Sequence, residues 1–193
     1  MSRAIAVRAV EAFELAACAG QLERLYRQCF STPPWLEPEE RLARFHDRLD
    51  GHVSNPGAGG VLVSDGDELV GAIYGWPAGR ELASGSPFDD ALAAAAPPEI
   101  AQRLVAPAVV VAELMVDPRH QRRGIGRALL TRYVEEWPAA WLATHPEAPA
   151  ATMYRQAGWR QEFEFAVDTR PMVVFTWQAP RRTAPSARRA VRG

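Results

Sequence analysis

The chain contains no lysine, so all 22 of its basic side chains are arginines. This absence excludes a P-loop, because that nucleotide-binding loop needs a lysine to reach the phosphates. Cysteine is almost as scarce, with Cys18 and Cys29 the only two in 193 residues. Neither is set among histidine or aspartate residues, which favours reduced packing thiols over a disulfide or a nucleophile.

Long hydrophobic runs and an excess of one charge are also missing. No stretch approaches the roughly 18 consecutive apolar residues of a membrane-spanning helix. The first twenty residues carry Glu11 and Glu14 where a signal peptide would be apolar. The formal net charge of −1 gives no uniform field that would attract nucleic acid or an anionic membrane. We therefore expect a cytoplasmic protein without a membrane or nucleic-acid partner.

The length and composition fit one folded domain. With 193 residues, 48% of them hydrophobic, the chain can bury a substantial core. The apolar periodicity ends near Gln178, after which arginine, proline and alanine dominate. We predict a single domain over residues 1–178 and a disordered tail over residues 179–193.

The spacing of apolar residues predicts alternating strands and helices. Strands are expected at 5–7, 61–63, 69–76, 109–116, 141–144, 161–167 and 171–177. Helices are expected at 15–30, 37–49, 124–137 and 146–157, with two short ones inside a long excursion at 77–107. This order predicts an α/β (α+β) protein with a mixed central sheet of about six to seven strands flanked by helices.

The most informative stretch runs from Ala112 to Leu130. The end of a buried strand, stopped by Asp117 and Pro118, leads through an arginine-rich turn into an amphipathic helix. The free N–H groups at a helix start, together with the positive end of the helix dipole, form a site for an anion.

The residues of this turn add to that anion site. Gly124 and Gly126 have no Cβ, so a phosphate can approach the main chain closely. Arg122, Arg123 and Arg127 supply positive charge around it. The predicted ligand is therefore a phosphorylated small molecule, most simply a pyrophosphate.

Two motifs relate the chain to a known family. The segment Gln121-Arg122-Arg123-Gly124-Ile125-Gly126 resembles the Q/R-x-x-G-x-G/A signature of the GNAT acetyltransferases, which move an acetyl group from acetyl-CoA to an amine. A dinucleotide fingerprint would need a third glycine where Leu129 stands. About thirty residues on, Met153 to Trp159 resembles the family's A-x-x-x-Y-x-x-x-G-F/W segment. The resemblance is specific for residues 109–159 and implies the GNAT fold, splayed at the cofactor-binding strand.

The resemblance also implies roles for individual residues. Tyr154 would lie beside the thioester and act as the general acid that protonates the leaving thiolate. The N–H of Val116 would be an oxyanion donor. The resemblance implies contact with acetyl-CoA at Leu114, Met115, Val116, Gln121, Arg122, Arg123, Gly124, Ile125, Gly126, Arg127 and Tyr154. The first three of these lie in the strand and would make the contact through their main-chain atoms. Glu147 departs from the family pattern, since many members have asparagine seven residues before the tyrosine. Either the side chain of Glu147 points to solvent, or the part of the cofactor that this asparagine contacts is held differently.

A general base is harder to identify. Glu113 is the only carboxylate inside an apolar strand, and burial there would raise its pKa toward a useful range. The alternative is a structural carboxylate. His145 is a second candidate base, although loop histidines more often have no such role, and water could carry the proton instead. His46 and His52 are expected to face water, and so is His120, which could instead contact the phosphate. No cluster has metal-ligand spacing, so no metal is expected.

We expect an N-acetyltransferase that moves the acetyl group to a primary amine of a small molecule or peptide by direct attack in a ternary complex. A non-catalytic acyl-CoA-binding module of the same fold and a transferase using a different acyl-CoA stay open, as does a homodimer. The aspartates of the excursion could attract a cationic amine or merely start a helix. Candidate acceptor-recognition residues are Trp35, Tyr74, Trp76, Phe88, Asp89 and Asp90.

Overall fold

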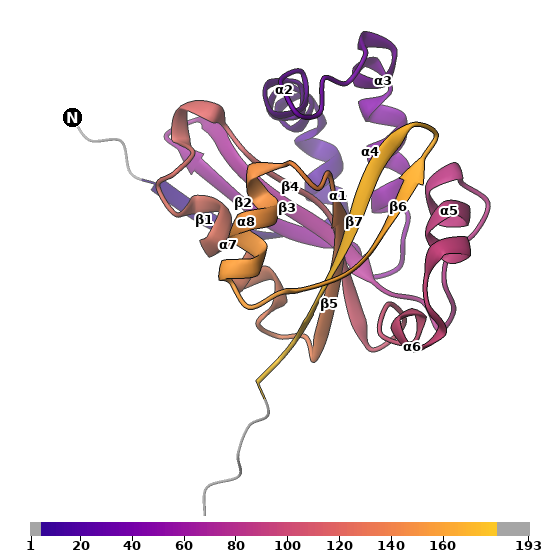
Figure 1. Ribbon diagram of the computed structural model, residues 1–193. Helices are drawn as coiled ribbons and strands as arrows, with labels where there is room; N and C mark the ends of the chain where they lie inside the picture. Colours follow the sequence, from indigo (N-terminus) through magenta and orange to yellow (C-terminus); the bar gives the residue numbers. More distant parts are fainter. Residues whose placement is uncertain (1–4, 181–193) are drawn as a thin grey trace, which may run out of the picture.

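The computed structural model describes residues 5–180, which form a seven-stranded mixed sheet covered by helices on both faces (Figure 1). The strands are β1 (Ile5–Glu11), β2 (Gly59–Asp65), β3 (Glu68–Pro77), β4 (Ala108–Val116), β5 (Ala139–Thr144), β6 (Arg160–Val167) and β7 (Arg170–Gln178). Their order in the sheet is β1-β2-β3-β4-β5-β7-β6, and the β4–β5 pair alone is parallel. The predicted mixed sheet is therefore confirmed. Most of the tail predicted at 179–193 lies outside the described residues.

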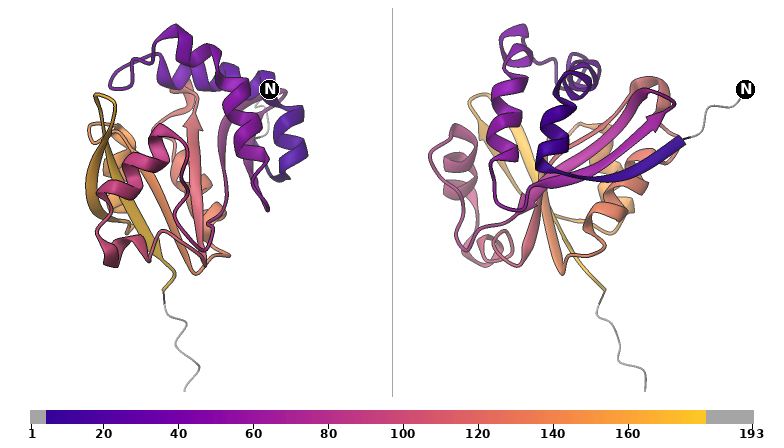
Figure 2. Two further views of the ribbon diagram at one scale, coloured as in Figure 1. Left: turned by 90° about the vertical axis from the view of Figure 1, so that its right-hand side faces the viewer. Right: turned by 180° about the vertical axis from the view of Figure 1, so that it is seen from behind.

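The helices divide between the two faces of the sheet. The first face is covered by α1 (Ala12–Ala17), α2 (Ala19–Phe30), α3 (Glu39–Ala43), α4 (Phe45–Val53), α5 (Pro87–Ala95) and α6 (Pro98–Ala101). The second face carries α7 (Ile125–Val134) and α8 (Pro149–Gln156), and a 3-10 turn at Pro118–His120 precedes α7. Figure 2 shows the two groups from the side and from behind. Apolar cores fill both interfaces, so β4, at the centre of the sheet, is buried on both sides.

Several helices begin or end at other residues than the sequence predicted. The helix predicted at 15–30 is interrupted at Cys18, whose N–H closes α1 on the carbonyls of Glu14 and Leu15. The one predicted at 37–49 is likewise divided, at Arg44, and its second part extends to Val53.

Proline accounts for two further differences. The central helix α7 ends at Val134 and not at Trp137, because Trp137 precedes Pro138 and proline disfavours a helical conformation in the residue before it. The helix expected from Pro146 begins instead at Pro149. A proline is tolerated in the first turn, but farther inside it would lack the N–H that the helix needs.

The strand β4 has different neighbours along its two edges. Along β3 it pairs over most of its length, with an irregularity where Tyr74 faces Glu113 and Gly75 faces Val111. A Cβ on Gly75 would lie 1.8 Å from the carbonyl oxygen of Val110, so only glycine permits this approach. Along β5 the register contains three pairs only, the last joining Val110 to Trp141. Beyond that pair, β4 and β5 diverge.

Candidate active site

The divergence of β4 from β5 leaves main-chain groups of a central strand without a partner strand. The N–H of Asp117 donates to the carbonyl of Val70 on β3 at 2.9 Å. Because successive residues of a strand turn their N–H and C=O groups to alternate sides, Leu114 and Val116 direct theirs away from β3. Along the diverging edge the N–H groups of both residues and the carbonyl of Leu114 therefore face no partner strand, which suits strand-like binding of an extended ligand. The carbonyl of Val116 instead accepts from the side chains of Gln121 and Cys29.

Met115 is placed differently from its two neighbours. It is the register partner of Ala72, so its main-chain groups are directed toward β3. Its side chain is buried in the core beneath α1–α4, with 1% of its surface exposed. This placement favours a packing role for Met115 and leaves contact with an extended ligand to Leu114 and Val116.

The turn between β4 and α7 has the backbone of an anion site. Gly124 caps α7 with a φ of 82°, which a residue with a side chain adopts only at a cost. Arg122 also has a left-handed backbone, with a φ of 60°. The first N–H groups of α7, from Ile125 to Arg127, have no intrahelical acceptor and point out of the helix start. Gly126 lies against Val116 and Met153, so this helix start adjoins the diverging edge of β4.

The arginines of the turn divide into two groups. Arg119 is held by Asp117 and Glu68, which neutralise it. Arg122, Arg123 and Arg127 are exposed and form no ion pair within residues 5–180, so their charge is available to a ligand. Gln121 instead donates its side-chain amide to the carbonyl of Val116 at 3.0 Å and ties the turn to the strand.

His120, which was expected to face water, is largely buried with its Nε2 3.5 Å from a carboxylate oxygen of Asp65. That expectation was wrong. The sequence signal that could have corrected it is the position of His120 inside the tight turn that follows Pro118, where the chain folds back on the β2–β3 end of the sheet.

Tyr154 lies on α8, on the second face of the sheet. Its ring packs on Trp159 and Phe175, with centroids 5.9 and 5.6 Å away, and 4% of the residue is exposed. Burial, with a further contribution from the negative charge of Glu113, raises the pKa of the Tyr154 hydroxyl well above its usual value. The hydroxyl therefore keeps its proton at neutral pH, as a general acid must.

Glu113 lies on the first face, beside its register partner Tyr74. Burial raises the pKa of its carboxyl group to about 7, with the charge of Arg48 acting in the opposite direction. Part of the residue still reaches solvent, and its carboxylate makes no hydrogen bond to any described residue. A carboxyl group that titrates near neutrality without a fixed partner is suited to accept a proton.

His145 and Glu147 occupy the loop between β5 and α8. The N–H of Glu147 donates to Nδ1 of His145 at 3.1 Å, so that this ring nitrogen serves as an acceptor and a neutral ring carries its proton on Nε2. This hydrogen bond occupies Nδ1, whereas the carboxylate of Glu113 has no such partner, which favours Glu113 as the base. The side chain of Glu147 is exposed, in agreement with the first of the two alternatives given for it.

The first face of the sheet contains polar residues whose placement the sequence did not reveal. His52 was expected to face water, but it packs between Tyr74 and Trp76, and burial lowers its pKa to about 4. That expectation was also wrong. Arg48 was not considered, and its guanidinium carbon lies 4.4 Å from the centre of the Tyr26 ring. The signal was available, since both side chains share a helical face with Phe45 and Leu49.

The structure favours the second of the two alternatives given for the aspartates of the excursion at 77–107, the start of a helix. Asp89 accepts from the hydroxyl of Ser86 and Asp90 from the N–H of Gly85, so both stabilise the start of α5. Phe88 packs edge-on against Phe165 with ring centroids 5.5 Å apart. Of the candidates for acceptor recognition, Trp35, Tyr74 and Trp76 remain.

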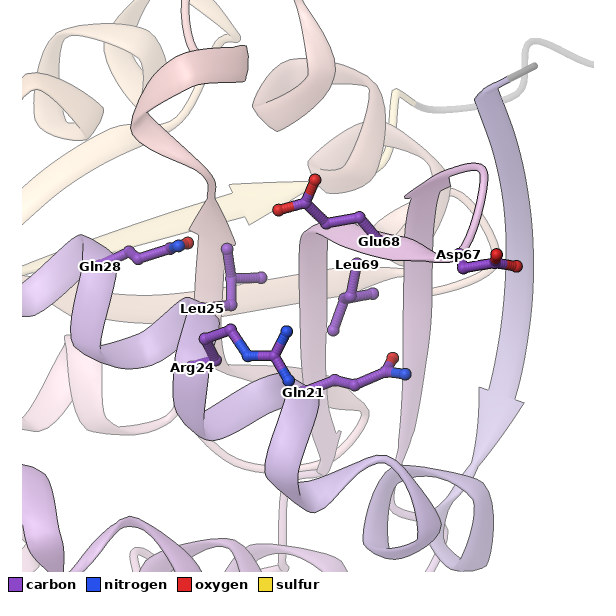
Figure 3. A pocket seen from close by; sticks show the side chains of 7 residues that line it. All are labelled: Gln21, Arg24, Leu25, Gln28, Asp67, Glu68 and Leu69. Atoms are coloured by element: carbon purple, nitrogen blue, oxygen red, sulfur yellow. The ribbon is translucent and has the colours of Figure 1, made fainter. Parts of the chain in front are cut away.

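Two hollows lie elsewhere on the molecule. One, between α2 and the β2–β3 turn, has a volume of about 30 Å³ and accommodates little more than water (Figure 3). The other, about 300 Å³, lies where β4 and β5 begin and β7 ends and is lined by Arg103, Thr176 and Trp177. Within the described part of the chain, no helix has the length and apolar character needed to cross a membrane. No group of three potential metal ligands occurs between residues 5 and 180.

Comparison with known proteins matches these features to one family. The family model described as "Acetyltransferase (GNAT) family" matches residues 20–159. A search of curated protein sequences found no match.

Three solved structures illustrate the likeness. A GNAT-family protein from Desulfovibrio desulfuricans is 18% identical with a TM-score of 0.62, covering 91% of this chain and 99% of its own. The PaiA N-acetyltransferase from Thermoplasma acidophilum, solved with coenzyme A, is 12% identical with a TM-score of 0.60 and the same coverages. The ribosomal-protein-S18-alanine N-acetyltransferase from Escherichia coli is 14% identical with a TM-score of 0.56, covering 94% of this chain and 99% of its own. At these identities the likeness establishes the shared fold.

Proposed function

The chain belongs to the GNAT family of acetyltransferases, and we propose that it transfers an acetyl group from acetyl-CoA to a primary amine of a small molecule or peptide. The observation that carries this proposal is the divergence of β4 from β5. It places the N–H of Val116 and the main-chain groups of Leu114, which have no partner strand, beside the exposed start of α7. Two neighbours of the same fold were solved with coenzyme A or acetyl-CoA, which supports the choice of donor.

The residues present fit the shape and charge of that donor. Leu114 and Val116 would hold the pantetheine arm through main-chain hydrogen bonds, as a neighbouring strand would. The helix start at Gly124–Arg127, with the exposed arginines of the turn, would hold the pyrophosphate. Gln121 would fix the turn against Val116 and so set the relative position of the two sites.

The chain's own residues then have distinct tasks in the transfer. Acetyl-CoA would supply a thioester carbonyl that is activated toward attack. The N–H of Val116 donates a hydrogen bond to the carbonyl oxygen, and Glu113 accepts a proton from the attacking amine. Tyr154 gives its proton to the departing sulfur as the C–N bond forms and the C–S bond breaks. The products are the acetylated amine and the free thiol of coenzyme A, and solvent returns the proton from Glu113 to Tyr154.

Calorimetric titration of the purified protein with acetyl-CoA tests the proposal, with ATP as a control that carries phosphates but no pantetheine. We expect acetyl-CoA to bind and ATP to bind much more weakly. A second step then measures thiol release with a panel of primary amines. Binding without thiol release from any amine would instead support a non-catalytic acyl-CoA-binding module. Release with a longer acyl-CoA, but none with acetyl-CoA, would point to a different donor.

A further inference from the structure

The first face of the sheet contains a group of buried polar side chains that the transfer chemistry explains only in part. We call it the polar cluster. Its members come from the α1–α4 segment and from β3 and β4. Each either changes the pKa of another member or, as for His52, has its own pKa changed by one. They are Tyr26, Glu37, Arg48, His52, Tyr74 and Glu113.

Glu37 is the one member whose charge is fully compensated. Its carboxylate accepts from the Tyr26 hydroxyl at 2.5 Å. It also pairs with Arg41 at 3.2 Å and with Arg170, at the start of β7, at 3.7 Å. With two cations and a hydroxyl around it, Glu37 is not needed to neutralise Arg48, and Arg48 makes no ion pair with it.

Arg48 forms no ion pair with a described residue, although the nearby charge of Glu113 raises the pKa of its guanidinium despite its burial. Its guanidinium lies over the ring of Tyr26, but the Nε and Nη2 atoms are buried and have no hydrogen-bond partner among the described residues. Leaving such donors unpaired costs free energy, because water that would satisfy them has been removed. A guanidinium presents its N–H groups in a planar fork that matches a carboxylate.

Tyr74 adds a second unpaired donor beside Arg48. Its hydroxyl is buried without a partner within residues 5–180, and 1% of the residue is exposed. Next to it, the pKa of His52 is lowered to about 4 by burial and by the charge of Arg48, so the ring is neutral at physiological pH. Arg48 and Tyr74 therefore bring one positive charge and unpaired donors together, next to the carboxylate of Glu113.

Glu113 supplies the opposite charge on the same face. No ion pair within 4.0 Å joins it to Arg48, although each affects the charge of the other. Glu113, Arg48 and His52 all keep partial solvent exposure, so the cluster borders the surface, although the unpaired atoms of Arg48 and Tyr74 are themselves buried. The cluster thus offers a separated negative and positive group to a ligand that carries both charges itself.

We infer that the acceptor is a small zwitterionic amine of the α-amino acid class, whose amine faces Glu113 and whose carboxylate is bound by Arg48 and the Tyr74 hydroxyl. This inference rests on the proposed function. It explains why the polar atoms next to the reacting amine are unpaired, since a ligand carboxylate would satisfy three of them at once.

Contacts over the cluster favour a small acceptor. Trp35, from the segment between α2 and α3, contacts the ring of His145 edge-on with centroids 5.7 Å apart. The ion pair between Glu37 and Arg170 joins the same segment to the β6–β7 turn. Both contacts join the first half of the chain to the second near the divergence, where an extended peptide would need room.

The first experiment measures acceptor binding and turnover separately. Calorimetry measures the binding of the twenty common L-amino acids to the protein, with and without coenzyme A. The corresponding amines, which lack the carboxylate, are titrated in the same way. The same compounds are then tested for thiol release from acetyl-CoA. We expect at least one amino acid to bind and react, and its decarboxylated amine and its carboxamide to react at least tenfold less efficiently. Equal or better use of amines without a carboxylate would overturn the inference, and so would binding of no amino acid at millimolar concentration.

The second experiment changes the carboxylate-binding residues. Arg48→Gln should raise the KM of the preferred amino acid about 10- to 100-fold, the range expected for a lost hydrogen bond to a charged group. Because the charge of Arg48 also lowers the pKa of Glu113, the comparison is made at a pH well above 7, where the KM of the decarboxylated amine and the affinity for acetyl-CoA should stay nearly unchanged. Tyr74→Phe removes only a hydroxyl and should give a smaller loss with the same selectivity, which keeps the test informative if Arg48→Gln folds poorly. Arg44→Gln, on the exposed side of the same helical segment, is the matched control.

The outcomes separate this inference from the proposed function. If acetyl-CoA does not bind, the proposed function fails, and binding of amino acids to the free protein still decides the carboxylate site. If amines are acetylated but Arg48→Gln lowers the use of amino acids and decarboxylated amines equally, the proposed function stands and the carboxylate site is refuted.

Discussion

Glu113 and Tyr154 lie on opposite faces of the sheet, yet the negative charge of the Glu113 carboxylate raises the pKa of the Tyr154 hydroxyl. Glu113 extends toward α1–α4 with its register partner Tyr74, whereas Tyr154 belongs to the core beneath α7 and α8. In a continuous sheet a strand would separate the two groups. The early end of the β4–β5 pairing removes that barrier, so in the proposed transfer Glu113 and Tyr154 would act on one reaction centre from its two sides.

The activity of the wild-type enzyme should depend on the ionisation of Glu113. Because the proposed base is the carboxylate, and burial raises its pKa to about 7, kcat/KM should rise with pH and level off above that value. Glu113→Gln should lose this inflection and about 10²- to 10⁴-fold in rate. Glu147→Gln, an exposed change near the same site, should keep both. An unaltered pH profile in Glu113→Gln would assign the proton to water or to another group.

The same pKa shift predicts an effect on folding stability. The unfolded chain loses the Glu113 proton near pH 4.5, whereas the folded protein keeps it up to about pH 7. Since the folded state then binds more protons in this interval, the free energy of unfolding should fall as pH rises from about 4.5 to 7.

Glu113→Gln should remove this dependence, with an upper limit of about 3 kcal/mol set by the size of the shift. Urea unfolding of wild type and variant at pH 5 and pH 8.5 measures this effect on the free energy of unfolding. His52 titrates in both proteins, so its contribution cancels when their free energies are subtracted. If wild type and variant differ in their free energy of unfolding by the same amount at both pH values, the ionised form of Glu113 does not destabilise the folded protein.

Tyr154→Phe should slow transfer by up to about 10²- to 10⁴-fold while the dissociation constant of acetyl-CoA stays within about twofold of wild type. The hydroxyl makes no hydrogen bond to any described residue, so its removal should cost little stability. Tyr133→Phe is the matched control, because the Tyr133 hydroxyl only contacts the Val110 carbonyl at 3.4 Å. Full turnover by Tyr154→Phe in single-turnover kinetics would remove this residue from the mechanism.

Two glycines of the phosphate turn should respond differently to substitution. Gly126→Asp should abolish acetyl-CoA binding by adding bulk and negative charge, but a Cβ there would meet nothing closer than Met153 Sδ at 3.4 Å, so the fold should tolerate it. Gly124→Ala should lower stability by about 1–2 kcal/mol, because the φ of 82° disfavours any side chain. Thermal unfolding and calorimetry of both variants distinguish these effects. Wild-type affinity in Gly126→Asp would refute the assignment of the turn to phosphate.

Local features of the site were predictable from the sequence. The strand, turn and helix of residues 109–134 follow from periodicity, from Pro118 and from the glycines, all of which act within a few residues. Gly158 takes the left-handed conformation expected after α8, with a φ of 84°. The interruption at Cys18 was not predictable, because apolar residues on both sides of it continue one helical pattern.

The polar cluster could not be predicted, because it depends on contacts between distant segments. Glu37 and Arg170 are 133 positions apart, and nothing near either residue indicates the other. His52 was misjudged, and Arg48 was not considered, for a related reason. On an isolated helix a charged or ring nitrogen next to an apolar stripe is expected to face water, and only the arrival of β3 and Tyr26 covers it.

The short register between β4 and β5 also has a consequence for the exchange of amide hydrogens with deuterated solvent. The amides of Met115 and Glu113 face β3 and should exchange slowly, whereas those of Leu114 and Val116 have no partner strand and should exchange fast. In this part of β4, every second amide should thus be protected from exchange as weakly as an amide of an edge strand, although β4 lies in the middle of the sheet. Slow exchange at Leu114 and Val116 should appear only once a ligand has taken the place of the missing neighbour.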